Sequence, residues 1–205
     1  MEKVAVRRIN EWDGPAMLKI FAPYVENTHA TPEETLPELS EYIQKIDKYT
    51  YGLGWLMCEI DSTPAGFCLL TENIDEANNP FSLQLQIYVR EEYKRMGVGT
   101  ALVALITDIM QYCNRKEVLV RVILPNEAAV SFFEKNGFEE EKILKKDAEK
   151  FGKSHDVLVL RRKLTPEDEN AERPTKPYLI LNALYEEARE KAAVIVWEKC
   201  RINGE

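Results

Sequence analysis

The fold is decided by a ten-residue stretch, which reads Glu91-Glu92-Tyr93-Lys94-Arg95-Met96-Gly97-Val98-Gly99-Thr100. Before it, residues 81–90 alternate between apolar and polar side chains, which predicts a half-buried strand with one polar face. After it, apolar residues recur at steps of three and four from Val98 to Cys113, which predicts an amphipathic helix. A strand, a glycine loop and a helix in this order are typical of an anion site, because the first N–H groups of a helix have no internal partner. Glycines before a helix also occur in plain turns, so the loop alone leaves both interpretations open.

The pattern on either side of this loop predicts an α+β domain with a mixed, mostly antiparallel sheet. Further strands are expected at residues 4–9, 54–60, 65–70, 116–124, 138–144 and 155–164. Helices are expected to begin near Asp13, near Pro37 and after Asn126, with Asp13 and Asn126 as N-caps. Gly137 is expected to end the last of these helices as a left-handed C-cap.

The composition changes after residue 164. Residues 165–176 are rich in Glu, Asp and Pro, which is typical of a linker. Residues 177–201 are expected to form one helix, although residues 192–197 also have strand propensity. The apolar stripe of this helix would consist of Leu181, Tyr185, Ala188, Ala192 and Ile195.

We therefore expect a domain at residues 1–164, an acidic linker at 165–176 and a C-terminal helical extension at 177–205. Three roles remain open for the extension. It would cover apolar surface of its own domain, pack across a homodimer, or shape a cleft.

The overall composition limits the classes of partner. The chain has 205 residues, of which 45% are hydrophobic, and a net charge of −8. An acidic chain without clustered Lys and Arg is not expected to bind nucleic acid or an anionic membrane surface. No apolar run approaches the roughly 18 residues that span a membrane, and the first residues lack the apolar core of a signal peptide. Four cysteines without metal-ligand spacing are typical of a reduced, cytoplasmic protein with no metal site.

A second motif follows the next predicted strand and reads Leu124-Pro125-Asn126-Glu127-Ala128-Ala129-Val130-Ser131-Phe132-Phe133-Glu134-Lys135-Asn136-Gly137-Phe138. It resembles the signature Asn-x-x-Ala-x-x-Phe-Tyr-x-x-x-Gly-Phe of the GNAT superfamily of N-acetyltransferases. The glycine loop resembles the acetyl-CoA loop of the same superfamily, Gln/Arg-x-x-Gly-x-Gly/Ala. The resemblance implies the GNAT fold, with splayed central strands and flanking helices. It also implies an acyl-CoA-dependent N-acyltransferase whose cosubstrate is acetyl-CoA.

Two further stretches resemble the phosphinothricin and methionine-sulfone acetyltransferase group. Residues 24–31 are similar to its Tyr-Val-x-x-Thr-x-Ala-Thr segment. Residues 150–158 are similar to its Lys-Phe-Gly-x-Trp-His-Asp-Val run, with Ser154 in place of the Trp. This resemblance implies transfer of an acetyl group to the primary amine of a small molecule. An amino-acid-like amine is one candidate for that molecule.

The resemblance also implies which residues hold the cosubstrate. Backbone groups of Ile87, Tyr88 and Val89 would bind the pantetheine arm by strand addition. Asn126 would contact the same arm or act only as a helix cap, and Phe133 would line the site. The pyrophosphate would lie in a cradle formed by Lys94, Arg95, Met96, Gly97, Val98, Gly99 and Thr100.

Acetyl transfer requires an unprotonated amine, because only its lone pair can attack a thioester. His155 is the preferred base, since imidazole titrates near neutral pH, and a purely structural hydrogen bond is its alternative role. The catalytic candidates are His155, Tyr88 and Gln84. The candidates for substrate binding are Tyr24, Thr28, Gln84, Gln86 and His155, with His29 as a weaker one.

The chain departs from these relatives at positions that matter to the chemistry. Gln84 stands where the phosphinothricin group usually has Glu, and an amide cannot accept a proton. Phe133 replaces a frequent tyrosine that protonates the thiolate, and Pro80 replaces an Arg near the Glu. These departures leave a second hypothesis, in which a catalytically impaired protein binds acyl-CoA as a sensor or scaffold.

Overall fold

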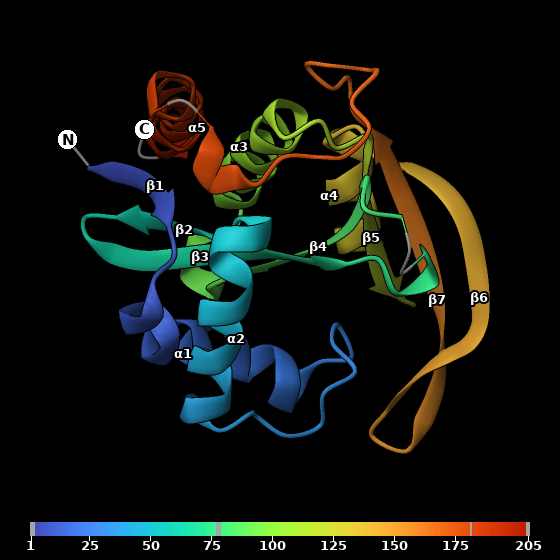
Figure 1. Cartoon of the computed structure of the whole chain (residues 1–205). Helices are drawn as coiled ribbons and strands as arrows, with labels where there is room; N and C mark the ends of the chain where they lie inside the picture. The colour runs from blue at the N-terminus through green and yellow to red at the C-terminus, as the bar shows by residue number, and fades with distance from the viewer. Residues whose placement is uncertain (1–2, 77–78, 181, 204–205) are drawn as a thin grey trace.

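The computed structural model describes residues 3–76, 79–180 and 182–203 (Figure 1). The strands in these ranges are β1 (Val4–Arg8), β2 (Leu56–Ile60), β3 (Thr63–Glu72), β4 (Ser82–Val89), β5 (Glu117–Ile123), β6 (Glu139–Lys150) and β7 (Lys153–Lys163). The helices are α1 (Gly14–Asn27), α2 (Leu39–Leu53), α3 (Val98–Tyr112), α4 (Glu127–Lys135) and α5 (Asn182–Asn203). Within the described residues the strands form one sheet in the order β1-β2-β3-β4-β5-β7-β6, in which only β4 and β5 are parallel. The predicted α+β class with a mixed, mostly antiparallel sheet is confirmed.

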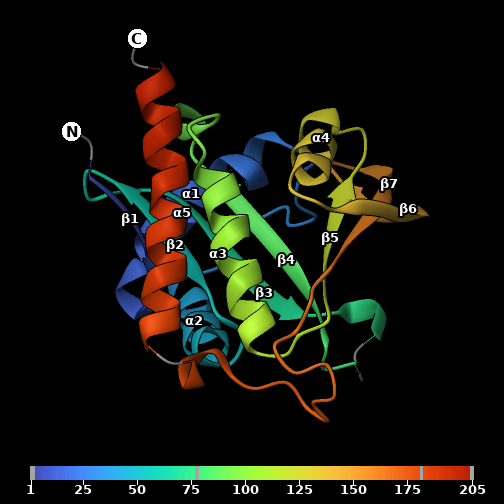
Figure 2. The same cartoon turned by 90° about the horizontal axis from the view of Figure 1, so that it is seen from above.

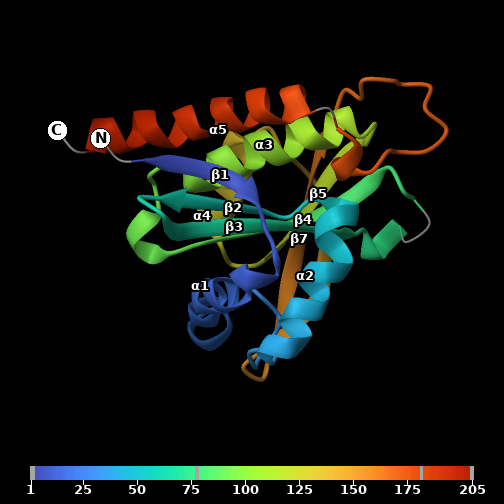
Figure 3. The same ribbon diagram turned by 60° about the vertical axis from the view of Figure 1, so that its left-hand side comes forward.

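Helices cover both faces of the sheet (Figure 3). α3 and α5 lie on one face, and α4 packs on the same side through Phe133. Leu102 of α3 and Ala192 of α5 belong to the core on that side. α1 and α2 lie on the other face, where Phe21 and Tyr88 belong to a second core. Each helix thus buries an apolar stripe against the sheet, which is the usual arrangement of layered domains.

The sheet opens between β4 and β5. Within the described residues these strands pair only where Ser82–Gln84 faces Glu117–Leu119. Beyond that point β4 remains paired with β3 as far as Val89, and β5 remains paired with β7 as far as Ile123. The ends of the two strands therefore diverge, and the predicted splay of the central strands is confirmed.

The polar face predicted for residues 81–90 is not exposed. Tyr88 is 7% exposed, and its ring centre lies 4.8 Å from that of Phe21 and 5.3 Å from that of Phe67. Ser82 is also buried, and its Oγ accepts a hydrogen bond from Asn73. The alternation located the strand correctly. Side-chain polarity did not reveal that α1 and α2 cover this face, because hydroxyl and amide groups are buried when they find partners.

Asp13 does not cap α1 with its side chain, contrary to expectation. Its carboxylate accepts hydrogen bonds from the Asn10 amide at 2.9 Å and from the Arg7 guanidinium at 2.7 and 2.8 Å. The hydrogen bond to Asp13 raises the pKa of Arg7 and ties β1 to the turn before α1. The other predicted caps are present: Asn126 Oδ1 accepts from the helix backbone, and Gly137 has a φ of 81°.

β6 and β7 extend further than predicted and form a long hairpin that reaches toward α1 (Figure 1). The charged residues within 145–150 concealed the end of β6, since all of them except Lys150 are exposed on an edge strand. Lys150 is the exception, because its side chain is fully buried.

α5 runs antiparallel to α3 and packs against α3 and β1 (Figure 2). Residues 192–197 belong to this helix and not to a strand. Leu181 of the predicted stripe lies outside the described residues, and Ile195 is only half-buried, since Val196 takes the deeper position. The buried residues of the helix are Tyr185, Ala188, Ala192 and Val196.

The segment between β7 and α5 is bonded to the end of α3. The Glu167 amide donates to the Gln111 carbonyl at 3.2 Å, and the Thr175 amide donates to the Cys113 carbonyl at 2.9 Å. These bonds hold the acidic segment against the sheet domain. Among the described helices, none combines the length and the apolar character needed to cross a membrane.

Candidate active site

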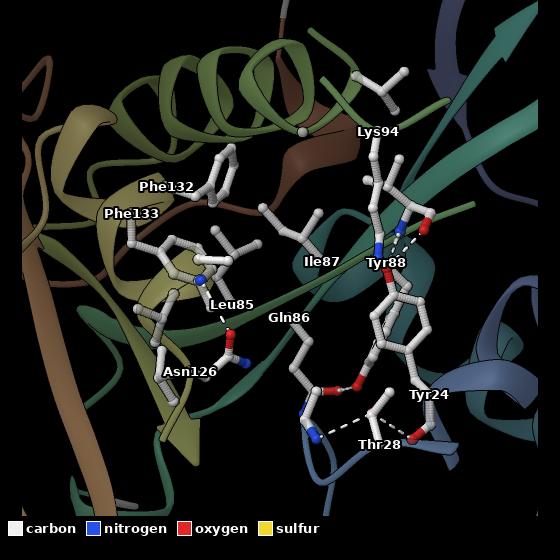
Figure 4. A pocket seen from close by; sticks show the side chains of 18 of the residues that line it. Tyr24, Thr28, Leu85, Gln86, Ile87, Tyr88, Lys94, Asn126, Phe132 and Phe133 are labelled. Carbon is white, nitrogen blue, oxygen red and sulfur yellow. Dashed lines mark hydrogen bonds between the residues drawn. The ribbon is translucent and has the colours of Figure 1, made fainter. Parts of the chain in front are cut away.

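A cavity of about 720 Å³ occupies the gap between β4 and β5. Its walls are β4 from Leu85 to Val89, β5 from Val120 to Ile123, the starts of α3 and α4, and the loop after α1. Figure 4 shows these elements converging, with Phe132 and Phe133 on one side and Tyr24 and Lys94 on the other. The size is typical of a small-molecule site.

The start of α3 supplies backbone donors to this cavity. Gly97 precedes the helix with a left-handed φ of 84°, and the first intrahelical hydrogen bond joins the Ala101 amide to the Gly97 carbonyl at 2.9 Å. The amides of Val98, Gly99 and Thr100 therefore have no acceptor within the helix, and these residues line the cavity. Unpaired amides at the positive end of a helix dipole are suited to bind an anion, which is the role that the glycine loop predicts for them.

The two loop glycines have close protein neighbours. A Cβ at Gly97 would lie 3.0 Å from the carbonyl oxygen of Ile195, and one at Gly99 would lie 2.9 Å from the ring of Phe132. The sequence argument assigned both glycines to the approach of a phosphate. In the structure α5 and α4 occupy the space that side chains would need, so both positions also serve helix packing.

The two cationic residues of the loop, Lys94 and Arg95, both line the cavity. Lys94 Nζ donates to Glu91 Oε2 at 2.6 Å and lies 5.6 Å from the centre of the Tyr24 ring (Figure 4). The hydrogen bond to Glu91 raises the pKa of Lys94, which keeps the amine charged. Arg95 lines the cavity, whereas Met96 packs against the apolar core and is not part of the lining. The residues predicted to form the cradle therefore all line the cavity, with the exception of Met96.

The open edge of β4 is partly occupied. Tyr24 Oη donates to the Val89 carbonyl at 2.6 Å and accepts from the Val89 amide at 3.1 Å. Tyr88 is paired with Phe67, and alternate residues of a strand direct their backbone groups to the same side. Ile87 therefore shares the cavity side with Val89. Of the three residues predicted to bind by strand addition, Ile87 has the backbone groups that best fit that role.

α4 contributes an amide and an aromatic wall. Asn126 Oδ1 accepts from the Ala129 amide at 3.2 Å, and the amide nitrogen of Asn126 lies on the cavity side (Figure 4). The two roles considered for Asn126 are therefore compatible. Phe133 makes edge-to-face contacts with Phe132 and Phe138, with ring centres 5.0 and 5.3 Å away. It supplies an apolar surface and no proton.

The two histidines of the chain lie side by side, and one of them lines the cavity. Their rings are stacked, with centres 5.0 Å apart and planes inclined by 6°. His29 Nε2 bonds to the Pro125 carbonyl at 2.7 Å, and His155 Nδ1 bonds to the Leu124 carbonyl at 3.0 Å. A carbonyl oxygen only accepts, so each bonded nitrogen carries the hydrogen and the second nitrogen of each neutral ring has a lone pair. His29 lines the cavity, whereas His155 is outside the lining.

The other polar candidates are placed unequally. Gln84 lies at the paired end of β4, outside the lining, and its buried Oε1 has no hydrogen-bond partner among the described residues. Gln86 lines the cavity and accepts from Tyr88 Oη at 3.1 Å. Burial raises the pKa of Tyr88, so the phenol stays protonated and is not a base at neutral pH. Thr28 lines the cavity, and its Oγ1 donates to the Tyr24 carbonyl at 2.8 Å.

Sequence reasoning missed several wall residues, of which Lys199 is the one from the C-terminal helix. Lys199 of α5 lines the cavity, although it lies far along the chain from both motifs. No pattern near Lys199 indicates this role, because it depends on how α5 packs across α3.

Comparisons with known proteins agree with this geometry. An uncharacterized N-acetyltransferase of Methanocaldococcus jannaschii is 28% identical over 96 residues, which are 45% of this chain and 42% of that protein, so the chain spans less than half of its length. Phosphinothricin N-acetyltransferase of Alcaligenes faecalis is 26% identical over 165 residues, which are 80% of this chain and 84% of that protein.

The fold is also that of a solved phosphinothricin acetyltransferase from Sinorhizobium meliloti, crystallised with acetyl-CoA. It superposes with a TM-score of 0.74 at 20% identity, over 84% of this chain and 93% of that chain. Residues 15–138 match the family described as the acetyltransferase (GNAT) family, which is more than half of the sequence. This protein therefore belongs to the GNAT family of acetyltransferases.

Proposed function

We propose that this acetyltransferase, whose cosubstrate is acetyl-CoA, acetylates the primary amine of a small, amino-acid-like molecule. Residues 1–164 would form the catalytic domain, residues 165–176 a linker and residues 177–205 an extension. The observation that carries the choice of a small acceptor is the loop after α1, which lines the cavity and is tied to the β6–β7 hairpin.

The tie between the loop and the hairpin depends on a buried lysine. Lys150 Nζ donates to the Val25 carbonyl at 2.7 Å and to the Glu33 carbonyl. The Phe151 amide donates to Glu34 Oε1 at 2.9 Å. The loop that carries Thr28 is therefore fixed at both ends across the acceptor side. A fixed loop and hairpin suit a compact amine better than a polypeptide, which would need an open groove.

The remaining parts of the cavity suit the cosubstrate. The free amides of Val98, Gly99 and Thr100 would hold the pyrophosphate, and the edge of β4 at Ile87 would bind the pantetheine arm. Asn126 would bind the same arm through its amide nitrogen. A neighbouring β4 amide would also be positioned to stabilise an oxyanion at the carbonyl under attack.

The stacked imidazoles are the groups suited to remove a proton from the amine. His29 is the ring in the cavity wall and would accept the proton, directly or through a water. His155 would position His29 by stacking and by its own bond to the Leu124 carbonyl. The structure thus favours His29 over the expected His155 as the ring nearest the acceptor. Gln84 and Tyr88 have no role as bases in this scheme.

The test is a transfer assay with acetyl-CoA and a panel of amines, followed by release of the free thiol. The panel contains matched pairs, in which each amino acid is compared with the amine that lacks its carboxylate, together with short peptides. We expect turnover that is fastest with an amino acid and slow with peptides. Acetylation of peptides alone would contradict the proposed acceptor class. Saturable CoA binding without turnover on any amine would support a sensor or scaffold instead.

A further inference from the structure

The C-terminal helix lies directly on the cofactor loop. A Cβ at Gly97 would be 3.0 Å from the Ile195 carbonyl oxygen, 3.3 Å from the Val196 Cα and 3.1 Å from the Lys199 Cγ. The match to the acetyltransferase family ends at Phe138, so α5 lies outside the matched residues. The cofactor end of the cavity therefore includes a wall from outside that match.

The position of this wall is fixed by packing. Tyr185, Ala188, Ala192 and Val196 recur along one face of α5 and are each at most 8% exposed. The Arg8 guanidinium lies 4.4 Å from the centre of the Tyr185 ring and adds a contact near the start of the helix. The backbone of Lys199, within a turn of Val196, is thus held in place although its side chain is exposed.

Lys199 adds a third cation to the two that the loop supplies, Lys94 and Arg95. Lys94 is hydrogen-bonded to Glu91 and lies against Tyr24, so its charge is partly balanced. Lys199 lines the cavity, and it has no ion-pair partner among the described residues. Its stem crosses Gly97, one residue before the amides that form the anion site. A net charge of −8 makes a local cation more important for an anionic ligand.

We propose that Lys199 binds a phosphate of acetyl-CoA and that α5 is a working part of the cosubstrate site. This proposal rests on the proposed binding of the cosubstrate at the start of α3. Each phosphate of the cosubstrate offers the same chemistry, an anionic oxygen that accepts a charge-assisted hydrogen bond from an ammonium group. The phosphate that Lys199 binds is either the pyrophosphate or the 3′-phosphate on the ribose.

The test compares Lys199→Met with Lys191→Met, a control on the same helix whose lysine is paired with Glu187 at 2.7 Å. Methionine keeps the length of the stem and removes the charge. Isothermal titration calorimetry measures CoA, 3′-dephospho-CoA and pantetheine binding to each protein. We expect Lys199→Met to weaken CoA binding by about 3- to 10-fold, with a smaller difference at high salt. Lys191→Met should leave CoA binding unchanged, and pantetheine binding should be equal in all three proteins.

The titrations also separate the possible outcomes. A loss that disappears with 3′-dephospho-CoA assigns Lys199 to the 3′-phosphate, and a loss that persists assigns it to the pyrophosphate. Lys199→Arg should retain most of the affinity. In the transfer assay, Lys199→Met should raise KM for acetyl-CoA and leave kcat unchanged.

Unchanged CoA affinity in Lys199→Met, or an equal loss in Lys191→Met, would overturn the role of Lys199. Neither result would affect the proposed function. A wild-type protein that does not bind CoA would instead contradict the proposed function itself, so the two failures are distinguishable. Because Lys199 is exposed, Lys199→Met should not change the thermal midpoint of unfolding. An unchanged midpoint would serve as the control that the variant is folded.

Discussion

The proposed cofactor end of the cavity is built from consecutive residues at the start of α3, whereas the proposed acceptor end is assembled from segments that are far apart in sequence. Gly97 and the amides after it owe their geometry to one local rule, the unpaired N–H groups of a helix start. At the acceptor end, His29 follows α1 and His155 lies on β7, and they meet only because the sheet brings those elements together. A site of the first kind is visible in sequence, and one of the second kind requires the fold.

The largest expected effect concerns the acceptor end. His29→Phe keeps an aromatic ring but removes the nitrogen with the lone pair, so kcat should fall about 100-fold while KM for acetyl-CoA stays the same. His155→Phe is the matched variant and should lower kcat by about tenfold, since it disturbs only the position of His29. Steady-state kinetics at saturating amine measure both. A greater loss in His155→Phe than in His29→Phe would reverse the roles of the two rings.

The next effect concerns the cofactor end. Gly97→Ala places a Cβ 3.0 Å from the Ile195 carbonyl in a residue with a φ of 84°, so it strains the backbone and pushes against α5. The free energy of unfolding should fall by about 2 kcal/mol, and CoA binding should weaken. Urea denaturation and calorimetry measure the two quantities.

Gly152→Ala is the control for this change, because Gly152 has a φ of 69° and nothing lies within 4 Å of a Cβ there. It should lower the free energy of unfolding by only about 1 kcal/mol and leave CoA binding unaltered. Equal losses in the two variants would show that contact with α5 contributes nothing at Gly97.

The smallest expected effect distinguishes the acceptor end of the cavity from the cofactor end. Lys150→Met leaves the carbonyls of Val25 and Glu33 without their donor, so it should lower the free energy of unfolding by about 1.5 kcal/mol. It should also raise KM for the amine and leave KM for acetyl-CoA unchanged. Lys153→Met, at an exposed position of the same hairpin, should change neither KM. A rise in KM for acetyl-CoA alone would show that the hydrogen bonds of Lys150 serve the cofactor end.

Much of the fold could be predicted, because local patterns determine it. Alternation located β4, and helical periodicity located α3. The covered polar face of β4 could not be predicted, since Tyr88 is buried by helices that come earlier in the chain. The end of β6 was hidden by its charged residues, because they lie on an edge strand.

The same distinction applies to the site. The loop from Lys94 to Thr100 was visible as a motif, apart from the inward packing of Met96. The preference for His155 rested on the chemistry of imidazole, which His29 shares, and not on position. Gln84 proved to lie outside the cavity lining. Lys199 could not be predicted, because only the packing of α5 on Gly97 brings it to the cavity.

The most direct test is a crystal structure of the protein with CoA and an amine analogue. The account predicts pyrophosphate oxygens within hydrogen-bond distance of the Val98, Gly99 and Thr100 amides, and the thiol between Asn126 and His29. CoA bound elsewhere, or a thiol directed away from the histidine pair, would contradict the assignment of the two ends.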